Sequence, residues 1–128
     1  MAKTPSDKWK KMILKYKKQC QSTLEISKNI RYVGVIKNYG RTLTGVIRPN
    51  LKPLLKSEEV KHEFFIISTL MSLRKDSHDS LGKLDHVVLK HSKVNVVVFL
   101  KNDVTFYISI NSKEKSLDKI ISLIKKTI

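Results

Sequence analysis

The sequence predicts one α+β domain, a five-stranded antiparallel sheet with helices on both faces. Three segments repeat apolar residues at helical spacing, and five short segments are rich in β-branched residues. Their order is α-β-β-α-β-β-β-α, and two short turns join the last three strands. The 128 residues suit a single domain. We expect a basic amphipathic helix over residues 1–28 and an α/β body over residues 29–128.

The first helix is predicted to begin at Thr4, which can cap it, with Pro5 in its first turn. Its end is expected near residues 27–29. Apolar residues recur behind the cap at helical spacing, namely Trp9, Met12, Ile13, Tyr16, Cys20 and Leu24.

A hairpin should follow, with strands over residues 31–37 and 42–47 around a turn that contains Gly40. Two prolines then make residues 49–53 a loop. Ser57 is the expected cap of the second helix, with Glu58 and Glu59 near its positive end.

The second helix has apolar residues around much of its circumference. One stripe contains Val60, Phe64, Ile67 and Met71. A second set widens that stripe, namely Phe65, Ile66, Leu70 and Leu73. We therefore expect this helix to be buried on most of its surface, and to end before Gly82.

Three further strands are predicted over residues 86–91, 94–100 and 104–110. The run from Val96 to Leu100 does not alternate with polar residues, which indicates a strand covered on both faces. A closing helix should present one apolar face made of Leu117, Ile120, Ile121, Ile124 and Ile128.

The charge is strongly positive, with 26 basic and 11 acidic residues and a net charge of +15. Such a field attracts polyanions, acidic partners or anionic lipid surfaces. Lysines account for most of the basic residues, which suits attraction to a phosphate backbone better than reading of a base sequence. Solvated lysines without a partner are the alternative interpretation.

A stripe of lysines on the first helix is the candidate polyanion-binding site, formed by Lys8, Lys11, Lys15 and Lys18. The alternative is a solvated helix face whose opposite side packs on the sheet. If the two terminal helices cover the same sheet face, lysines of the closing helix would enlarge this patch.

No catalytic, cofactor-binding or metal-binding residues are expected, and we interpret the chain as a non-enzyme. It lacks triad, phosphate-loop, dinucleotide-binding and paired-cysteine motifs. Asp76, His78 and Asp79 lie close in sequence, but a polar loop at a helix end explains them. Cys20 on the apolar stripe is interpreted as a core thiol. One cysteine, no signal-peptide pattern and no membrane span favour a cytoplasmic location.

The first hairpin and the element order resemble the roadblock-type domain, which has a profilin-like sheet. The local match is Tyr32-Val33-Gly34-Val35-Ile36, the turn Asn38-Tyr39-Gly40-Arg41, and Thr42-Leu43-Thr44-Gly45. The resemblance covers about residues 29–128. The chain also resembles a small archaeal protein family that supplies no activity. It departs from the roadblock pattern in its longer 49–56 connection and its high positive charge.

The roadblock resemblance implies a non-catalytic, dimeric platform that binds protein partners such as small GTPases. Family dimers join through the central helix and the strand after it, which here implies an interface with Phe64, Met71, Val87 and Leu89. Lys90 and Lys93 at the end of that strand argue against strand pairing. Two further hypotheses stay open, a lysine-driven nucleic-acid binder and a small-ligand pocket between the sheet and the helix over residues 60–74.

Overall fold

The computed structural model describes residues 4–128, and the order of its main helices and strands confirms the predicted fold class. Met1, Ala2 and Lys3, which the prediction included in the first helix, lie outside the described residues. The main elements are α1 (Pro5–Leu24), β1 (Ile30–Ile36), β2 (Thr42–Ile47), α2 (Ser57–Arg74), β3 (Val87–Lys90), β4 (Val94–Lys101), β5 (Val104–Asn111) and α4 (Leu117–Thr127). Short helical turns lie at Asn38–Gly40 and Lys75–Ser77, and a four-residue helix, α3, at His78–Leu81.

The five strands form one antiparallel sheet in the order β2-β1-β5-β4-β3. Pairing of β1 with β5 therefore joins the first hairpin to the three C-terminal strands. β2 and β3 are the two edge strands. Every strand boundary lies within one residue of its predicted position, because turns with Gly, Asn or Ser separate the apolar runs.

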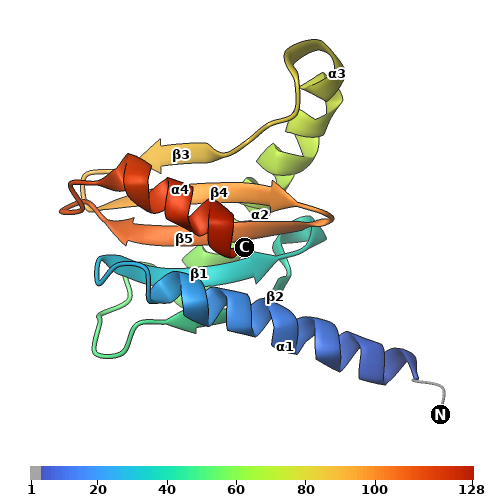
Figure 1. Cartoon of the computed structure of the whole chain (residues 1–128), viewed down its shortest axis with the longest axis horizontal. Coiled ribbons are helices and arrows are strands. Elements are labelled where there is room, and N and C mark those ends of the chain that lie inside the picture. Colours follow the sequence, from blue (N-terminus) through green and yellow to red (C-terminus); the bar gives the residue numbers. More distant parts are fainter. Residues whose placement is uncertain (1–3) are drawn as a thin grey trace.

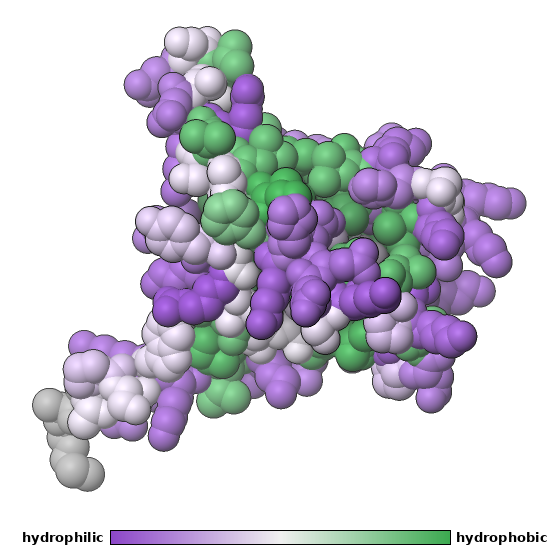
Figure 2. Space-filling view, turned by 180° about the vertical axis from the view of Figure 1, so that it is seen from behind, coloured by the Kyte–Doolittle hydropathy of each residue, from purple (hydrophilic) through white to green (hydrophobic). Residues whose placement is uncertain are grey.

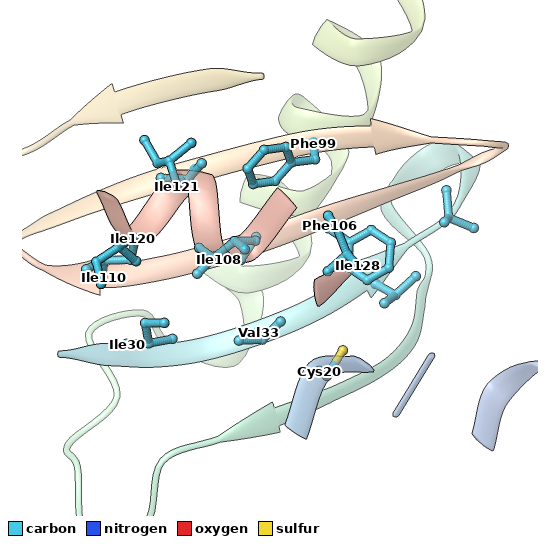
Figure 3. Close-up of a cluster of buried hydrophobic side chains, with 14 residues drawn as sticks. Cys20, Ile30, Val33, Phe99, Phe106, Ile108, Ile110, Ile120, Ile121 and Ile128 are labelled. Atoms are coloured by element: carbon cyan, nitrogen blue, oxygen red, sulfur yellow. The ribbon is translucent and has the colours of Figure 1, made fainter. Parts of the chain in front are cut away.

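The sheet separates two hydrophobic clusters, one under each layer of helices. Figure 1 shows α1 and α4 in front of the sheet and α2 behind it. The front cluster contains Cys20 of α1, Phe106 of β5 and Ile124 of α4, and Figure 3 shows its side chains from both helices and the sheet. The rear cluster contains Phe64, Ile67 and Met71 of α2. The expected burial of β4 on both faces is confirmed, since Val96 to Phe99 are all buried.

Helix ends are set by hydrogen bonds between side chains and backbone. Thr4 caps α1 as predicted, since its Oγ1 accepts from the Asp7 backbone N–H at 3.2 Å. The cap predicted for α2 was off by one residue. Lys56 is the N-cap, because its backbone N–H donates to Glu59 Oε1 at 3.0 Å and Ser57 is already helical.

α1 ends at Leu24, slightly before the predicted end, and Arg48, which directly follows β2, holds the chain that comes after α1. The Arg48 guanidinium donates to the carbonyl oxygens of Leu24, Ser27 and Ile30 at 2.6–2.9 Å. Carbonyl groups at a helix end lack partners inside the helix, so these bonds stabilise the turn from α1 into β1.

The N-terminal half of α1 extends beyond the sheet, as Figure 1 shows. Trp9, which the periodicity placed on the packed side, is 42% exposed, and Lys37 Nζ lies 5.7 Å from the centre of its ring. The apolar stripe is covered only where α1 crosses the sheet. Within residues 4–128, no helix is long and apolar enough to span a membrane.

Candidate interaction surface

The helix α2 has two apolar faces, and the sheet covers only one of them. The stripe predicted to be buried does pack on the sheet, with Phe64, Ile67 and Met71 at most 4% exposed. The prediction that most of the helix is buried was wrong, since Phe65 is 49%, Ile66 47% and Leu73 62% exposed. A flat sheet face can contact only one side of a helix. The turn at Asn38–Gly40 packs against the α2 backbone at Phe64 and Phe65, but it leaves these side chains of the outer side about half exposed or more.

We use the name outer face of α2 for Phe65, Ile66 and Leu73. Ile66 and Leu73 are seven residues apart, about two helical turns, and Phe65 directly precedes Ile66, so the three lie on one side of the helix. Figure 2 shows apolar side chains gathered over the upper part of the rear surface, on the side of the sheet that α2 covers. Such a contiguous exposed apolar area is typical of interaction sites.

The edge strand β3 borders the rear cluster, on which α2 packs. Val87 and Leu89 are half-buried and pack against the rear cluster with α2. β3 pairs with β4 only on one side, which leaves its other backbone edge at the margin of the sheet. Lys90 and Lys93 are exposed at the end of this strand, as the sequence indicated.

The structure brings the four predicted interface residues into one cluster but assigns them different positions. Phe64 and Met71 lie inside the monomer, so they support the surface and are not themselves accessible to a partner. Val87 and Leu89 are partly accessible. The sequence reasoning missed the outer face of α2, although one signal was present: the helix has more apolar residues than one sheet face can cover.

The four lysines of the predicted polyanion site are all exposed on α1. α1 and α4 lie on the same face of the sheet, as the sequence analysis considered. Five lysines of α4 and the loop before it are exposed as well, namely Lys113, Lys115, Lys119, Lys125 and Lys126. This face of the molecule therefore concentrates positive charge.

Hydrogen bonds of the charged side chains near β3 connect elements of the fold. Asp85 lies between His86 and Lys125, which ties the start of β3 to α4, and the Lys125 and His86 hydrogen bonds lower the pKa of Asp85. Burial raises the pKa of the Cys20 thiol to about 12, as expected of a core thiol. Among residues 4–128, no group of three or more His, Cys, Asp or Glu side chains could hold a metal ion.

Comparison with known proteins shows which known fold this architecture matches. No protein-family model matches the sequence, and no curated protein matches it. Solved structures do match. The gliding protein MglB of Thermus thermophilus superimposes with a TM-score of 0.67 at 12% identity, over 85% of this chain and 78% of that one. MglB of Myxococcus xanthus gives a TM-score of 0.67 at 9% identity, over 88% of each chain.

A roadblock/LC7 domain from Streptomyces avermitilis gives a TM-score of 0.62 at 10% identity, over 85% of this chain and 90% of that chain. The chain has the roadblock/LC7 fold. The resemblance seen in the first hairpin is thus confirmed at the level of fold. In this fold, α2 and the edge strand β3 both contribute to the rear cluster described above.

Proposed function

We propose that the protein is a non-catalytic, homodimeric platform of roadblock type, which joins through the outer face of α2 and presents a composite surface to a protein partner. The exposed apolar side chains of Phe65, Ile66 and Leu73 carry this proposal. A second copy related by a two-fold axis would bury the same patch on both chains. One of the similar solved structures is MglB with a tetrameric arrangement.

The helix contributes more to this proposed contact than the strand does. Two β3 edges placed side by side would bring Lys90 and Lys93 of each copy close to those of the other. Like charges directly opposite each other oppose strand pairing. Val87 and Leu89 would then lie at the margin of a contact centred on α2.

The oligomeric state tests this proposal. We expect sedimentation equilibrium at micromolar concentrations to give a dimer, and the Phe65→Glu/Leu73→Glu variant to be a folded monomer. Leu14→Glu is the matched control, because Leu14 is 58% exposed on α1, away from α2. A strict monomer for the unmodified protein contradicts the proposal, and a dimer that survives in the double variant places the contact elsewhere.

The family resemblance supports a small GTPase as the class of partner, and the single cysteine supports a cytoplasmic site of action. Both belong to this proposal. The dimer would offer the partner a surface that spans two copies. Sedimentation velocity with a candidate GTPase in its two nucleotide states tests the partner class. If no complex forms with the GTPase in either nucleotide state, the proposed class of partner is contradicted.

A second candidate function is sequence-independent binding of nucleic acid through Lys8, Lys11, Lys15 and Lys18. The projection of α1 beyond the sheet, with all four lysines exposed, favours it. Each phosphate neutralised by a lysine releases a counterion, so affinity should fall steeply with salt. Contact with several phosphates predicts a loss of about a hundredfold or more between about 50 and 200 mM salt.

Fluorescence anisotropy with duplex DNA and RNA measures this salt dependence. Reversal of the four α1 lysines to glutamate should abolish binding. Reversal of four exposed lysines elsewhere is the charge-matched control and should weaken binding less; suitable positions are Lys56, Lys61, Lys75 and Lys93. Equal losses in both variants would show that net charge, and not the α1 surface, attracts the nucleic acid.

A further inference from the structure

We propose that the cavity beneath residues 51–55 binds a small organic anion with an apolar tail, of the medium-chain fatty acid type. The cavity has a volume of about 270 Å³ and lies between the sheet and the first half of α2. Leu51 and Leu54 line it from the loop, and Val60 and Phe64 line it from the helix. It is separate from the outer face of α2, so this inference does not depend on the proposed dimer.

The floor of the cavity is an aromatic surface held in place by two glycines. Gly34 of β1 pairs with Gly45 of β2, and a Cβ on either residue would overlap the Tyr32 ring. The absence of both Cβ atoms allows that ring to lie flat on the sheet. Its centre lies 6.1 Å from that of Phe64 and 6.2 Å from that of Tyr107. These contacts fix the ring, so the floor is formed before any ligand arrives.

The mouth of the cavity exposes apolar side chains that a ligand tail could cover. Ile47 is 55%, Leu54 48% and Leu55 37% exposed, and all three line the cavity. The strand β2 and the loop therefore contribute apolar surface at one place. Burial of such surface by an alkyl chain is favourable, because it removes apolar area from water.

The charged residues around the cavity favour a ligand that carries a negative charge. Arg31 and Lys52 line it, and within residues 4–128 no aspartate or glutamate does. The nearby Glu63 accepts a hydrogen bond from the Tyr107 hydroxyl at 2.8 Å. Arg31 Nη2 donates to the Lys52 carbonyl oxygen at 2.8 Å, which holds the guanidinium beside the loop. A guanidinium presents further N–H donors in a planar fork that matches a carboxylate.

The size of the cavity limits the ligand. Pockets for drug-sized molecules span roughly 300–1,000 Å³, so this cavity suits a single short chain. A carboxylate near Arg31 with its alkyl chain over Tyr32 satisfies both the charge and the apolar lining. The loop of residues 51–55 is the segment that closes the cavity.

Titration with decanoate below its micelle concentration tests the inference, with calorimetry for affinity and amide chemical shifts for position. We expect shifts at Tyr32, Leu51 and Val60, and no binding of decylamine, which has the same tail length and the opposite charge. Shifts confined to the outer face of α2, or equal binding of decylamine, would overturn the proposal. So would the absence of any saturable binding.

Two variants locate the anion and its tail. Arg31→Gln should weaken decanoate binding about tenfold, the loss typical of one hydrogen bond to a charged group. Arg74→Gln removes the same charge from an exposed position at the end of α2 and should bind normally. Val60→Phe should fill the cavity and abolish binding, with circular dichroism used to confirm its fold. Unchanged affinity in both Arg31→Gln and Val60→Phe would show that the cavity is not the site.

Discussion

The Ser27 hydroxyl donates to Glu114 Oε1 at 2.6 Å, which joins the connection after α1 to the loop before α4. Glu114 Oε2 also accepts from the Ser116 backbone N–H at 3.1 Å. The Ser27 hydrogen bond is the largest cause that lowers the pKa of Glu114, followed by the bond from Ser116. One carboxylate thus fixes two loops that are far apart in sequence, at the side of the sheet where α1 and α4 both approach it.

Glu114→Gln should lower the free energy of unfolding at pH 7 by at most about 1 kcal/mol, because the carboxylate is partly exposed and solvent screens it. Its folded pKa is depressed. The carboxylate therefore stabilises the fold above the unfolded pKa of about 4.3, and this contribution is lost as the pH falls through the lower folded value. Urea unfolding of both proteins at several pH values should show their difference shrinking toward acid.

Glu25→Gln is the control for that series, because Glu25 is an exposed glutamate just after α1. It should leave stability nearly unchanged. A difference for Glu114→Gln that stays constant down to pH 2 would show that the side chain acts through shape and not through its charge.

Gly45→Ala should destabilise the protein by about 1–3 kcal/mol, the usual cost of an added group in a packed site. The new Cβ would lie 2.5 Å from Tyr32 Oη, and Phe64 and Tyr107 hold that ring in place. In a Tyr32→Leu background the same change should cost less. A double-mutant cycle by urea unfolding measures this coupling. Equal costs in both backgrounds would contradict the close approach of ring and glycine.

The buried tyrosines should make the protein lose stability in alkali. Burial raises the pKa of Tyr32 to about 12, and burial together with the Glu63 hydrogen bond raises the pKa of Tyr107 further. A raised folded pKa means that stability is fully present below the unfolded value of about 10 and declines as the pH rises toward the folded one.

Unfolding of the unmodified protein and of Tyr32→Phe, measured at pH values from about 9 to 11, checks this expectation. The variant should lose less stability with increasing pH, because one of the two buried phenols is gone. Parallel curves for the two proteins would mean that the Tyr32 phenol ionises as readily in the folded state as in the unfolded one.

Cys20 should react slowly with thiol reagents in the native protein. Its side chain is fully buried, and desolvation raises its pKa to about 12, so almost no thiolate is present at neutral pH. Reaction with a chromogenic disulfide should proceed at least about a hundredfold faster in denaturant than in buffer, since local opening limits the native reaction. Rapid labelling without loss of circular dichroism would contradict burial of this thiol.

Sequence periodicity located the helices and strands because turn residues separate them, and it identified the inner stripe of α2. It did not identify the outer face of that helix. Phe65 and Phe64 are neighbours with the same chemistry, yet one is 49% and the other 4% exposed. Which of them faces the sheet depends on how α2 is rotated, and long-range packing fixes that rotation.

The sequence left a pocket between the sheet and α2 open as a hypothesis, but the residues that line the cavity could not be predicted, for a related reason. Its outer wall is the loop of residues 51–55, and the position of that loop depends on the bond from Arg31 to the Lys52 carbonyl, across 21 residues. Turn composition indicates that a loop exists, but not which side chains it covers. By contrast, the exposure of the α1 lysines followed directly from their place opposite the apolar stripe.

The pairing of β1 with β5 has a consequence for synthesis of the chain. Val33 lies opposite Ile108, so the centre of the sheet cannot form until the residues of β5 have left the ribosome. Before that moment the β1–β2 hairpin and α2 have no sheet to cover their apolar sides. Contacts between residues that are distant in sequence slow folding, and hydrophobic surface that is prone to aggregation stays exposed until they form. The many lysines give these partly folded chains a high positive charge, and the repulsion between the chains would oppose their aggregation.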